Sequence, residues 1–370
     1  MTLGDGTRCV HAGLPAAEPG APVGPQPVLA SQFHLGGAHS YGRAENPTWD
    51  ALETAIGDLD GGTCVVFASG MAATTSLLRT VLRAGDTVVL PSDGYYLTRT
   101  YVRDNLAALG LTVRELPTGM VWTADMVEGA RLVIVETPSN PRLDVCDVAA
   151  VADHAHAAGA LMAVDNTTAT PLGQRPLSLG ADVVFASDTK ALSGHSDVVL
   201  GHISATDPDL AARLRSERTG SGSVPGPFEV WLAHRGLGTL DLRLARQAEN
   251  AAAVYEALRE HPRVRGIRWP GSEHDPAHEI ASRQMRRFGG VVTFELESAE
   301  AAESFVAATT LVSAATSFGG LHSTADRRAR WGDPVPEGLL RFSCGCEDSA
   351  DLVADLLTAL ANPRVPTSRQ

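Results

Sequence analysis

The chain reads SDTKALSGHSDVVLG from residue 187 to residue 201, directly after the apolar run DVVFA at 182–186. An earlier run, ALMAV at 160–164, leads into VDNTT at 164–168 in the same way. Short apolar runs that lack polar alternation and are separated by helical patterns predict a parallel sheet buried on both faces. Ligands of such sheets collect beyond the carboxyl ends of the strands. Asp165 and Lys190, which follow these two runs, therefore mark a candidate site.

The same rhythm extends outward from these strands. Further apolar runs precede them at 64–67, 87–90, 111–116 and 131–136, with helical patterns at 71–82 and 145–158. We expect the second helix to begin after Asp144 and to end at Gly159. The pattern predicts an α/β protein with a mainly parallel sheet.

The pattern also predicts three parts of the chain. Residues 1–55 are rich in Gly, Pro, Ala and His, which favours an extended arm and rules out long helices. Residues 56–245 form the large domain that contains the sheet. Residues 246–370 form a smaller α+β domain, which a long helical pattern at 240–261 introduces.

The composition excludes several classes of partner. The formal net charge is −13 and the chain has no basic run, so nucleic acid and anionic membranes are poor partners. No stretch approaches the ~18 apolar residues of a membrane span. The five cysteines are odd in number and scattered, which fits reduced thiols in a cytoplasm. Cys344 and Cys346 resemble half of a zinc site, but no second pair has ligand spacing, so no metal is expected.

Lys190 is the only lysine among the 30 basic residues. Arginine replaces lysine in most surface roles, but it does not supply a nucleophilic amine. An acid at one strand end and Ser-x-Thr-Lys at the next suit pyridoxal phosphate, whose pyridine nitrogen Asp165 would keep protonated. FASGMAA at 67–73 adds a turn that opens a helix, where free N–H groups bind phosphate. Neither GxGxxG nor GxxxxGK[ST] occurs, which argues against a Rossmann or P-loop site.

Several long motifs in order resemble those of the Cys/Met-metabolism pyridoxal-phosphate enzymes, and the resemblance runs nearly end to end. The motifs are VHAG (10–13), YGRAENPT (41–48), FASGMAA (67–73), ETPSNP (136–141), VDNTT (164–168), SDTKALSGHSDVVLG (187–201), TSFGGLHS (316–323) and LLRFSCGCED (339–348). The family includes cystathionine γ-lyase, cystathionine γ-synthase, cystathionine β-lyase and methionine γ-lyase, and the chain is closest in type to cystathionine γ-lyase. The resemblance implies fold type I of the PLP-dependent transferases, which is aspartate-aminotransferase-like.

The resemblance also implies roles for individual residues. Lys190 matches the Schiff-base lysine and Asp165 the partner of the pyridine nitrogen. The phosphate cradle is matched by Gly70, Met71, Ser187 and Thr189. Tyr95 matches the tyrosine stacked on the ring and is a candidate acid for the departing sulfur. Groups near the ring hydroxyl and the substrate α-carboxylate are matched by Asn140, Ser317 and Arg341.

Tyr41 and Arg43 match residues that reach the phosphate of a neighbouring subunit's cofactor. The resemblance therefore implies a homotetramer built from two dimers, with active sites shared between subunits.

Three positions depart from the family pattern. Ser40 and Thr316 stand where glutamates often hold the distal amino group of cystathionine, and His322 stands where another acid is expected. The pocket therefore offers less to a distal ammonium, which leaves the identity of the leaving group open.

The leading hypothesis is γ-elimination from a sulfur amino acid, with cystathionine giving cysteine, 2-oxobutanoate and ammonia. Release of methanethiol from methionine, or γ-replacement on an activated homoserine, are the alternatives within the family. A non-catalytic binding protein that keeps the fold is the alternative from another class, and Lys190, Asp165 and Arg341 argue against it.

Overall fold

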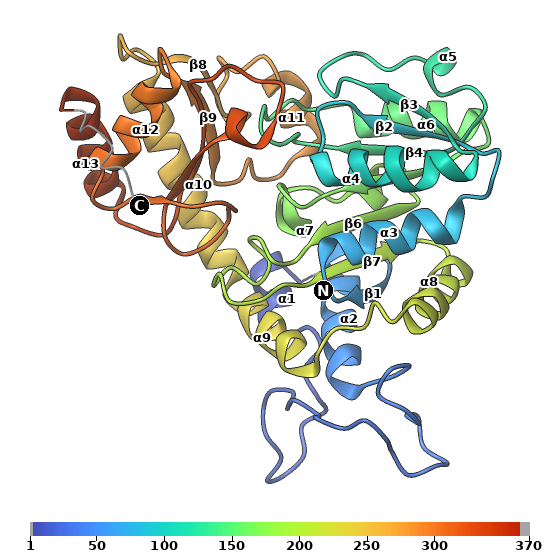
Figure 1. Cartoon of the computed structure of the whole chain (residues 1–370). Coiled ribbons are helices and arrows are strands. Elements are labelled where there is room, and N and C mark those ends of the chain that lie inside the picture. The colour runs from blue at the N-terminus through green and yellow to red at the C-terminus, as the bar shows by residue number, and fades with distance from the viewer. Residues whose placement is uncertain (1–2, 363–370) are drawn as a thin grey trace.

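The apolar runs of the first half form a seven-stranded sheet in a computed structural model that describes residues 3–362 (Figure 1). The strands are β1 (Thr63–Phe67), β2 (Thr87–Pro91), β3 (Thr112–Leu116), β4 (Ala130–Glu136), β5 (Leu161–Asp165), β6 (Val183–Ser187) and β7 (Gly201–Ala205). Their order is β1-β7-β6-β5-β4-β2-β3. The five strands from β6 to β3 run parallel, as predicted, and β7 is antiparallel to both β1 and β6. The strand β7 is not among the strands predicted from the sequence.

Helices cover both faces of this sheet, which explains why its strands are apolar throughout. They are α2 (Pro47–Asp60), α3 (Gly70–Val81), α4 (Tyr96–Tyr101), α5 (Ala124–Val127), α6 (Val148–Ala157), α7 (Thr170–Gly173), α8 (Pro208–Ser221) and α9 (Pro227–Leu237), with short η1 (Val102–Leu106), η2 (Ala107–Leu109) and η3 (Pro176–Leu179). The predicted start of α6 after Asp144 is wrong. Asp147 is the N-cap, because its carboxylate accepts the N–H of Ala150 at 3.1 Å.

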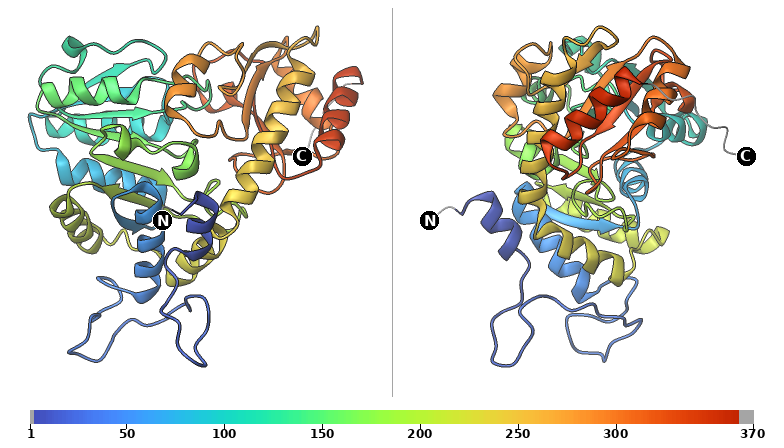
Figure 2. Two further views of the ribbon diagram at one scale, coloured as in Figure 1. Left: turned by 180° about the vertical axis from the view of Figure 1, so that it is seen from behind. Right: turned by 90° about the vertical axis from the view of Figure 1, so that its left-hand side faces the viewer.

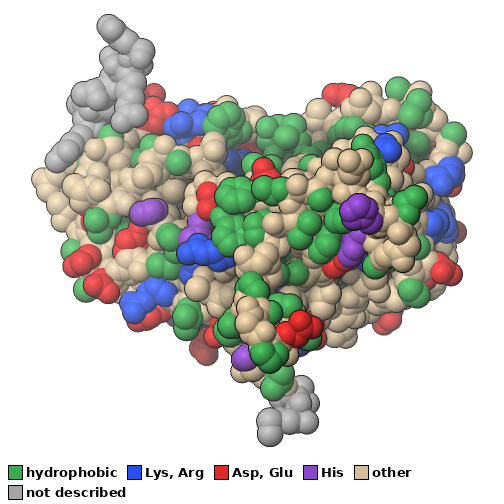
Figure 3. Space-filling view, turned by 90° about the horizontal axis from the view of Figure 1, so that it is seen from below, with side chains coloured by type: hydrophobic (Ala, Val, Ile, Leu, Met, Phe, Trp, Pro, Cys, Tyr) green, Lys and Arg blue, Asp and Glu red, His purple; other side chains and the backbone are tan. Residues whose placement is uncertain are grey.

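The residues between α1 (Asp5–His11) and α2 form an arm that projects from the body of the molecule (Figures 1 and 2). The helix α1 itself packs against α2 and α10, and the arm consists of turns and irregular chain up to Asn46, whose side chain caps α2 by accepting the Thr48 N–H. Val23, Leu29 and Leu35 expose 76–89% of their surface along it. Figure 3 looks at this face, where hydrophobic side chains gather on and behind the arm.

The small domain packs helices on one five-stranded sheet. The helix α10 (Leu240–Leu258) crosses the predicted domain boundary at 245/246 and joins the two domains (Figure 1). The other elements are β8 (Arg265–Arg268), α11 (His278–Gln284), β9 (Val291–Glu295), α12 (Ala299–Ala308), β10 (Ser313–Ala314), β11 (Thr324–Arg327), η4 (Arg328–Trp331), β12 (Leu339–Ser343) and α13 (Ser349–Ala361).

The strand order in the small domain is β10-β11-β12-β9-β8, and only β10 and β11 pair in parallel. The outer ends of the predicted arm and small domain, 1–2 and 363–370, lie outside the described residues. Within residues 3–362, none of the helices combines the length and the apolarity that crossing a bilayer would require.

Candidate active site

A cavity of about 520 Å³ lies where the carboxyl ends of β4, β5 and β6 meet the start of α3 and the small-domain segments at 316–318, 328–331 and 341. The lining includes the predicted residues Gly70, Met71, Tyr95, Asn140, Asp165, Ser187, Thr189, Lys190, Ser317 and Arg341. The structure therefore brings together ten predicted site residues from both domains.

Lys190 lies three residues after the end of β6, and its amine faces this cavity. Its Nζ donates a hydrogen bond to Ser317 Oγ at 2.7 Å and lies 5.4 Å from the ring centroid of Phe318. Burial, together with the positive charges of Arg341 and Arg328, lowers the pKa of Lys190 to about 8 against the attraction of Asp165. About a tenth of this amine is therefore unprotonated at pH 7, far more than for an ordinary lysine, and the unprotonated form is the one that acts as a base or nucleophile.

Asp165 and Glu136 end neighbouring parallel strands and are direct register partners. Burial raises the pKa of Asp165, while hydrogen bonds to Thr167 and the charges of His202 and Lys190 oppose that rise. Burial and the charge of Asp165 raise the pKa of Glu136 well above its usual range. Glu136 is used by the backbone, because its Oε2 accepts the Tyr95 N–H at 2.6 Å. Asp165 also accepts one backbone N–H, that of Thr167, through its Oδ1 at 3.0 Å, and both carboxylates line the cavity.

The beginning of α3 also lines the cavity. Ser69 caps this helix through the N–H of Ala72 at 3.0 Å, and the first amides of a helix have no partner within it. A Cβ on Gly70 would lie 2.7 Å from the Cβ of Ser187, so only glycine allows so close an approach. Thr189 is engaged locally, because its hydroxyl donates to the Leu200 carbonyl at 3.2 Å and accepts the Leu200 N–H at 3.1 Å.

Arg341 reaches the cavity from β12 of the small domain. Its guanidinium donates to Asn140 Oδ1 at 2.8 Å and to the Ser317 carbonyl at 3.2 Å. Its Nε is buried without a hydrogen-bond partner among the described residues. Burial lowers the pKa of Arg341 to about 10, which leaves it cationic at neutral pH. Ser317 contacts both Lys190 and Arg341, and it has a φ of 80°. A residue with a side chain is thus held in the left-handed region.

Tyr95 begins the turn into α4 and lines the cavity beside Tyr96, with ring centroids 5.3 Å apart. Burial raises the pKa of Tyr95, and the positive charges of Arg328 and Arg341 oppose that rise. The phenol therefore keeps its proton at neutral pH.

A buried chain of charges supports the turn that carries Lys190. His202 Nδ1 lies 2.6 Å from Asp188 Oδ1, and its Nε2 lies 3.1 Å from Asp60 Oδ2, which also accepts the Ser204 hydroxyl at 2.7 Å. Burial disfavours the charged imidazole, but the two carboxylates outweigh this effect and raise the pKa of His202 to about 10. Sequence reasoning missed this chain, which links residues 142 positions apart.

Two predicted residues do not reach this cavity. Tyr41 and Arg43 lie exposed on the arm, where the Arg43 guanidinium sits 5.5 Å from the ring of Tyr41. Their expected service to a neighbouring subunit remains a prediction. Of the departures from the family pattern, Thr316 lines the cavity, whereas Ser40 and His322 are exposed and absent from its lining.

Sequence reasoning also missed Glu136, Phe318, Arg328 and Trp331, which line the cavity. Glu136 carried a signal, because it ends a predicted strand of the same sheet edge as Asp165. Arg328 and Trp331 carried none beyond an arginine-rich stretch at 327–331.

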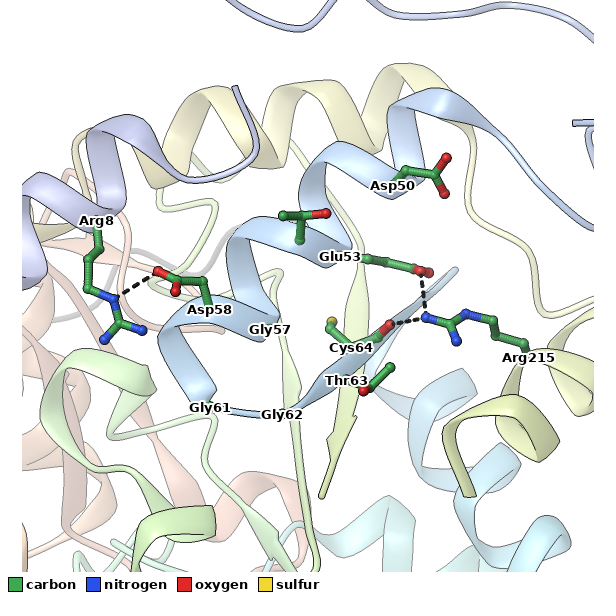
Figure 4. Close-up of a pocket in the computed structure, with 11 residues that line it drawn as sticks. Arg8, Asp50, Glu53, Gly57, Asp58, Gly61, Gly62, Thr63, Cys64 and Arg215 are labelled. Carbon is green, nitrogen blue, oxygen red and sulfur yellow. Dashed lines mark hydrogen bonds and ion pairs between the residues drawn. The ribbon is translucent and has the colours of Figure 1, made fainter. Parts of the chain in front are cut away.

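A second hollow lies between α1, α2, β1 and α8 (Figure 4). Four of its charged groups form two pairs, with Arg8 2.8 Å from Asp58 and Arg215 3.4 Å from Glu53, and Asp50 pairs with His39 outside the hollow. These pairs join helices to α2, and we assign this hollow no chemistry.

The residues of the first cavity fit pyridoxal phosphate. A glycine-lined helix start can accept a phosphate, a carboxylate at the end of β5 can hold a protonated ring nitrogen, and an amine at Lys190 can bond to an aldehyde. These three features line one cavity.

Comparison with known proteins agrees with this geometry. A model of the family described as Cys/Met metabolism PLP-dependent enzyme matches residues 28–361. A Streptomyces coelicolor protein named provisionally as a cystathionine gamma-lyase is 54% identical over 96% of this chain and 93% of its own. The Mycobacterium tuberculosis cystathionine gamma-synthase is 39% identical over 96% of this chain and 97% of its own. The structure of CalE6 from Micromonospora echinospora, described as a methionine gamma lyase, superimposes with a TM-score of 0.92 at 37% identity and covers 97% of this chain and 99% of that one.

Proposed function

The chain belongs to the Cys/Met metabolism PLP-dependent enzymes, and from this premise we propose that it catalyses γ-elimination on a sulfur amino acid. Cystathionine and water would give cysteine, 2-oxobutanoate and ammonia. The observation that carries the proposal is the buried Lys190 amine, with its pKa lowered to about 8, beside Ser317 and near Arg341. An amine in that setting can remove a proton from a substrate whose carboxylate Arg341 holds.

Pyridoxal phosphate, when bound, supplies an electron sink that stabilises negative charge at the substrate Cα. We assign the phosphate to the amides and hydroxyls of Gly70, Met71, Ser187 and Thr189 at the start of α3 and the end of β6. Thr189 must then release its bond to the Leu200 carbonyl to donate to the phosphate. We assign the ring nitrogen to Asp165, a ring face to Tyr95 and the ring hydroxyl to Asn140.

The protein's own groups would then handle the substrate and its protons. Arg341 binds the α-carboxylate as a planar fork, with Asn140 and Ser317 fixing its position. Lys190 Nζ takes the proton from Cα and, after passing that proton on, takes one from Cβ, whose electron pair forms a Cβ–Cγ double bond as the Cγ–S bond breaks. Tyr95 Oη, which keeps its proton because burial raises its pKa, donates to the sulfur that leaves Cγ.

We propose a homotetramer of two dimers in which Tyr41 and Arg43 of one arm bind the phosphate of the neighbouring subunit. The projecting arm and its exposed apolar side chains support this assignment. All five cysteines are free thiols, which supports a cytoplasmic setting. Arg43→Ala should weaken cofactor binding, and mixing it with a Lys190→Ala chain should restore some activity. Absence of rescue with subunit exchange confirmed would show that the arm serves its own subunit.

The second candidate is γ-replacement on an activated homoserine, in which a thiol such as cysteine displaces the γ-substituent. The 39% identity to a cystathionine gamma-synthase favours it. Release of methanethiol from methionine is a third candidate, since CalE6 is described as a methionine gamma lyase in one structure and as a cystathionine gamma lyase in another.

Product analysis separates these candidates. The purified holoenzyme should release 2-oxobutanoate from cystathionine faster than from methionine or homocysteine, with little pyruvate from cysteine. Faster formation of cystathionine from an acyl-homoserine and cysteine would replace the lyase assignment with the synthase. A colourless protein that binds no pyridoxal phosphate would overturn both and leave a non-catalytic binding protein.

A further inference from the structure

Arg328 is a buried guanidinium in the wall of the cavity, and the roles assigned above do not use it. It begins η4 in the small domain and exposes 6% of its surface. Its Nε donates to Asp333 Oδ2 at 2.8 Å, its Nη1 donates to Asp326 Oδ2 at 2.8 Å, and its Nη2 lies 2.7 Å from Asp333 Oδ2. These contacts engage three of its five N–H groups and leave one on each terminal nitrogen.

The carboxylates that pair with Arg328 are shared with its neighbourhood, because Asp326 Oδ2 also lies 3.9 Å from Arg341 Nη2. Arg328 is part of the lining, whereas Asp326 and Asp333 are buried and are not. Asp326 is also fixed from another direction, because it accepts the indole N–H of Trp331 at 2.9 Å. These contacts fix the position of the Arg328 guanidinium.

The charged residues that line the cavity differ between the two domains, and Lys190 is the cation that the large domain contributes. Its two lining carboxylates, Glu136 and Asp165, are side by side at the strand ends of the large domain. The lining residues from the small domain include Arg328 and Arg341 but no carboxylate, and Thr316 is neutral. A substrate side chain that extends into this half of the cavity therefore meets N–H donors.

We propose that Arg328 binds a carboxylate at the distal end of the substrate's γ-substituent, while Arg341 binds the α-carboxylate. The inference rests on the proposed function and narrows its substrate class to amino acids with a carboxylate at both ends. Cystathionine belongs to this class through its second carboxylate, as does a homoserine ester of a dicarboxylic acid. Methionine and homocysteine do not.

The expected preference is moderate because Arg328 is already paired. Arg328, Arg341, Asp326 and Asp333 sum to zero charge, so the gain comes from N–H groups aimed at the ligand rather than from a net positive field. One such contact changes a selectivity ratio by about tenfold.

Binding of unreactive ligands tests the inference independently of turnover. The holoenzyme is titrated with three diacids, L-2-aminoadipate, L-2-aminopimelate and L-2-aminosuberate, and the cofactor absorbance is followed. Each has a matched ligand in which a methyl group replaces the distal carboxylate: norleucine, 2-aminoheptanoate and 2-aminooctanoate. The three lengths cover the reach from the α-carboxylate to Arg328. At least one diacid should bind about tenfold more tightly than its match.

Arg328→Gln should remove this preference, and Arg330→Gln should keep it. Arg330 lies in the same helical turn, is exposed, is absent from the lining and pairs with Glu303 at 3.4 Å, and its only contact with the Arg328 group among the described residues is a 4.0 Å approach of its Nε to Asp326 Oδ1, which makes it the matched control. Because Arg328→Gln leaves two buried carboxylates without their partner, Arg328→Gln/Asp333→Asn is measured beside it. Either variant that binds the cofactor with a wild-type circular dichroism spectrum serves as the test.

The outcomes separate the two proposals. Equal affinity within every pair in the wild type, or a preference unchanged in a folded Arg328 variant, overturns the assignment of Arg328. A preference that depends on Arg328, in an enzyme that turns over no sulfur amino acid and no acyl-homoserine, upholds Arg328 and rejects the proposed function.

Discussion

Two cations near the cavity are each held between two carboxylates, and the two groups differ in what they leave free. In the large domain, His202 lies between Asp60 and Asp188, and all three are at least 98% buried. In the small domain, Arg328 lies between Asp326 and Asp333, but one side of its guanidinium faces the cavity. The group of His202, Asp60 and Asp188 is closed to the cavity, so it can only position the chain. The group of Arg328, Asp326 and Asp333 is open to the cavity, so it also offers N–H donors to a ligand.

The closed group acts on the turn above it. Asp188 stands between Ser187 and Thr189 and two residues before Lys190, so its bond to His202 fixes the strand end that carries the amine. Removing His202 leaves two carboxylates unpaired in an apolar core. This costs more folding stability than removing a cation that borders water.

The largest expected effect is on catalysis, and it comes from substituting Lys190, which this turn carries. Lys190→Ala should lower kcat by more than about a thousandfold, because the base is lost and the chain has no second lysine. Borohydride reduction of the wild-type holoenzyme should attach the cofactor only to the peptide that contains Lys190. Label at the N-terminal amine would contradict the assignment.

The next effect is on stability and compares a buried with a surface histidine pair. His202→Gln should lower the free energy of unfolding by about 3–5 kcal/mol in urea, because it leaves two buried carboxylates facing a neutral side chain. His156→Gln is the control, since His156 lies 2.9 Å from Asp182 at the surface and should contribute at most about 1 kcal/mol. Similar losses in both variants would show that His202 does not carry a buried charge.

This contrast also separates what the sequence predicts from what it does not. Asp165, Lys190 and Gly70 were predictable because each lies at the end of a strand or the start of a helix, within a short motif. The parallel strands of the sheet were predictable because each forms an apolar run that a helical pattern or loop separates from the next. The strand β7 was missed because it begins inside the motif and returns antiparallel. His202, Asp60 and Arg328 depend on contacts made only when the chain has folded.

The third effect is smaller and concerns substrate selectivity in the part of the cavity that the small domain lines. Thr316 lines the cavity without a charge, so Thr316→Glu places a carboxylate where a distal ammonium of cystathionine lacks a partner. The ratio of kcat/KM for cystathionine to that for methionine should rise about tenfold. Glu45, which accepts the Ser40 N–H at 3.1 Å on the arm, is the alternative source of that charge. An unchanged ratio in Thr316→Glu, with a lowered ratio in Glu45→Gln, would assign the ammonium to the arm.

The smallest effect is the pH dependence of the closed group. The pKa of His202 is about 10 in the folded chain and about 6.5 when unfolded, so its contribution is complete below pH 6.5 and is lost as the pH rises through 10. Between pH 7 and pH 8 the folded state keeps a proton that the unfolded state releases, and the wild type should lose about 1 kcal/mol of stability relative to His202→Gln. In the protein without cofactor, Lys190 acts in the opposite direction because its pKa is lowered, but both proteins contain it and the difference isolates His202. Parallel urea midpoints of wild type and His202→Gln over this range would show that the imidazole between Asp60 and Asp188 is neutral.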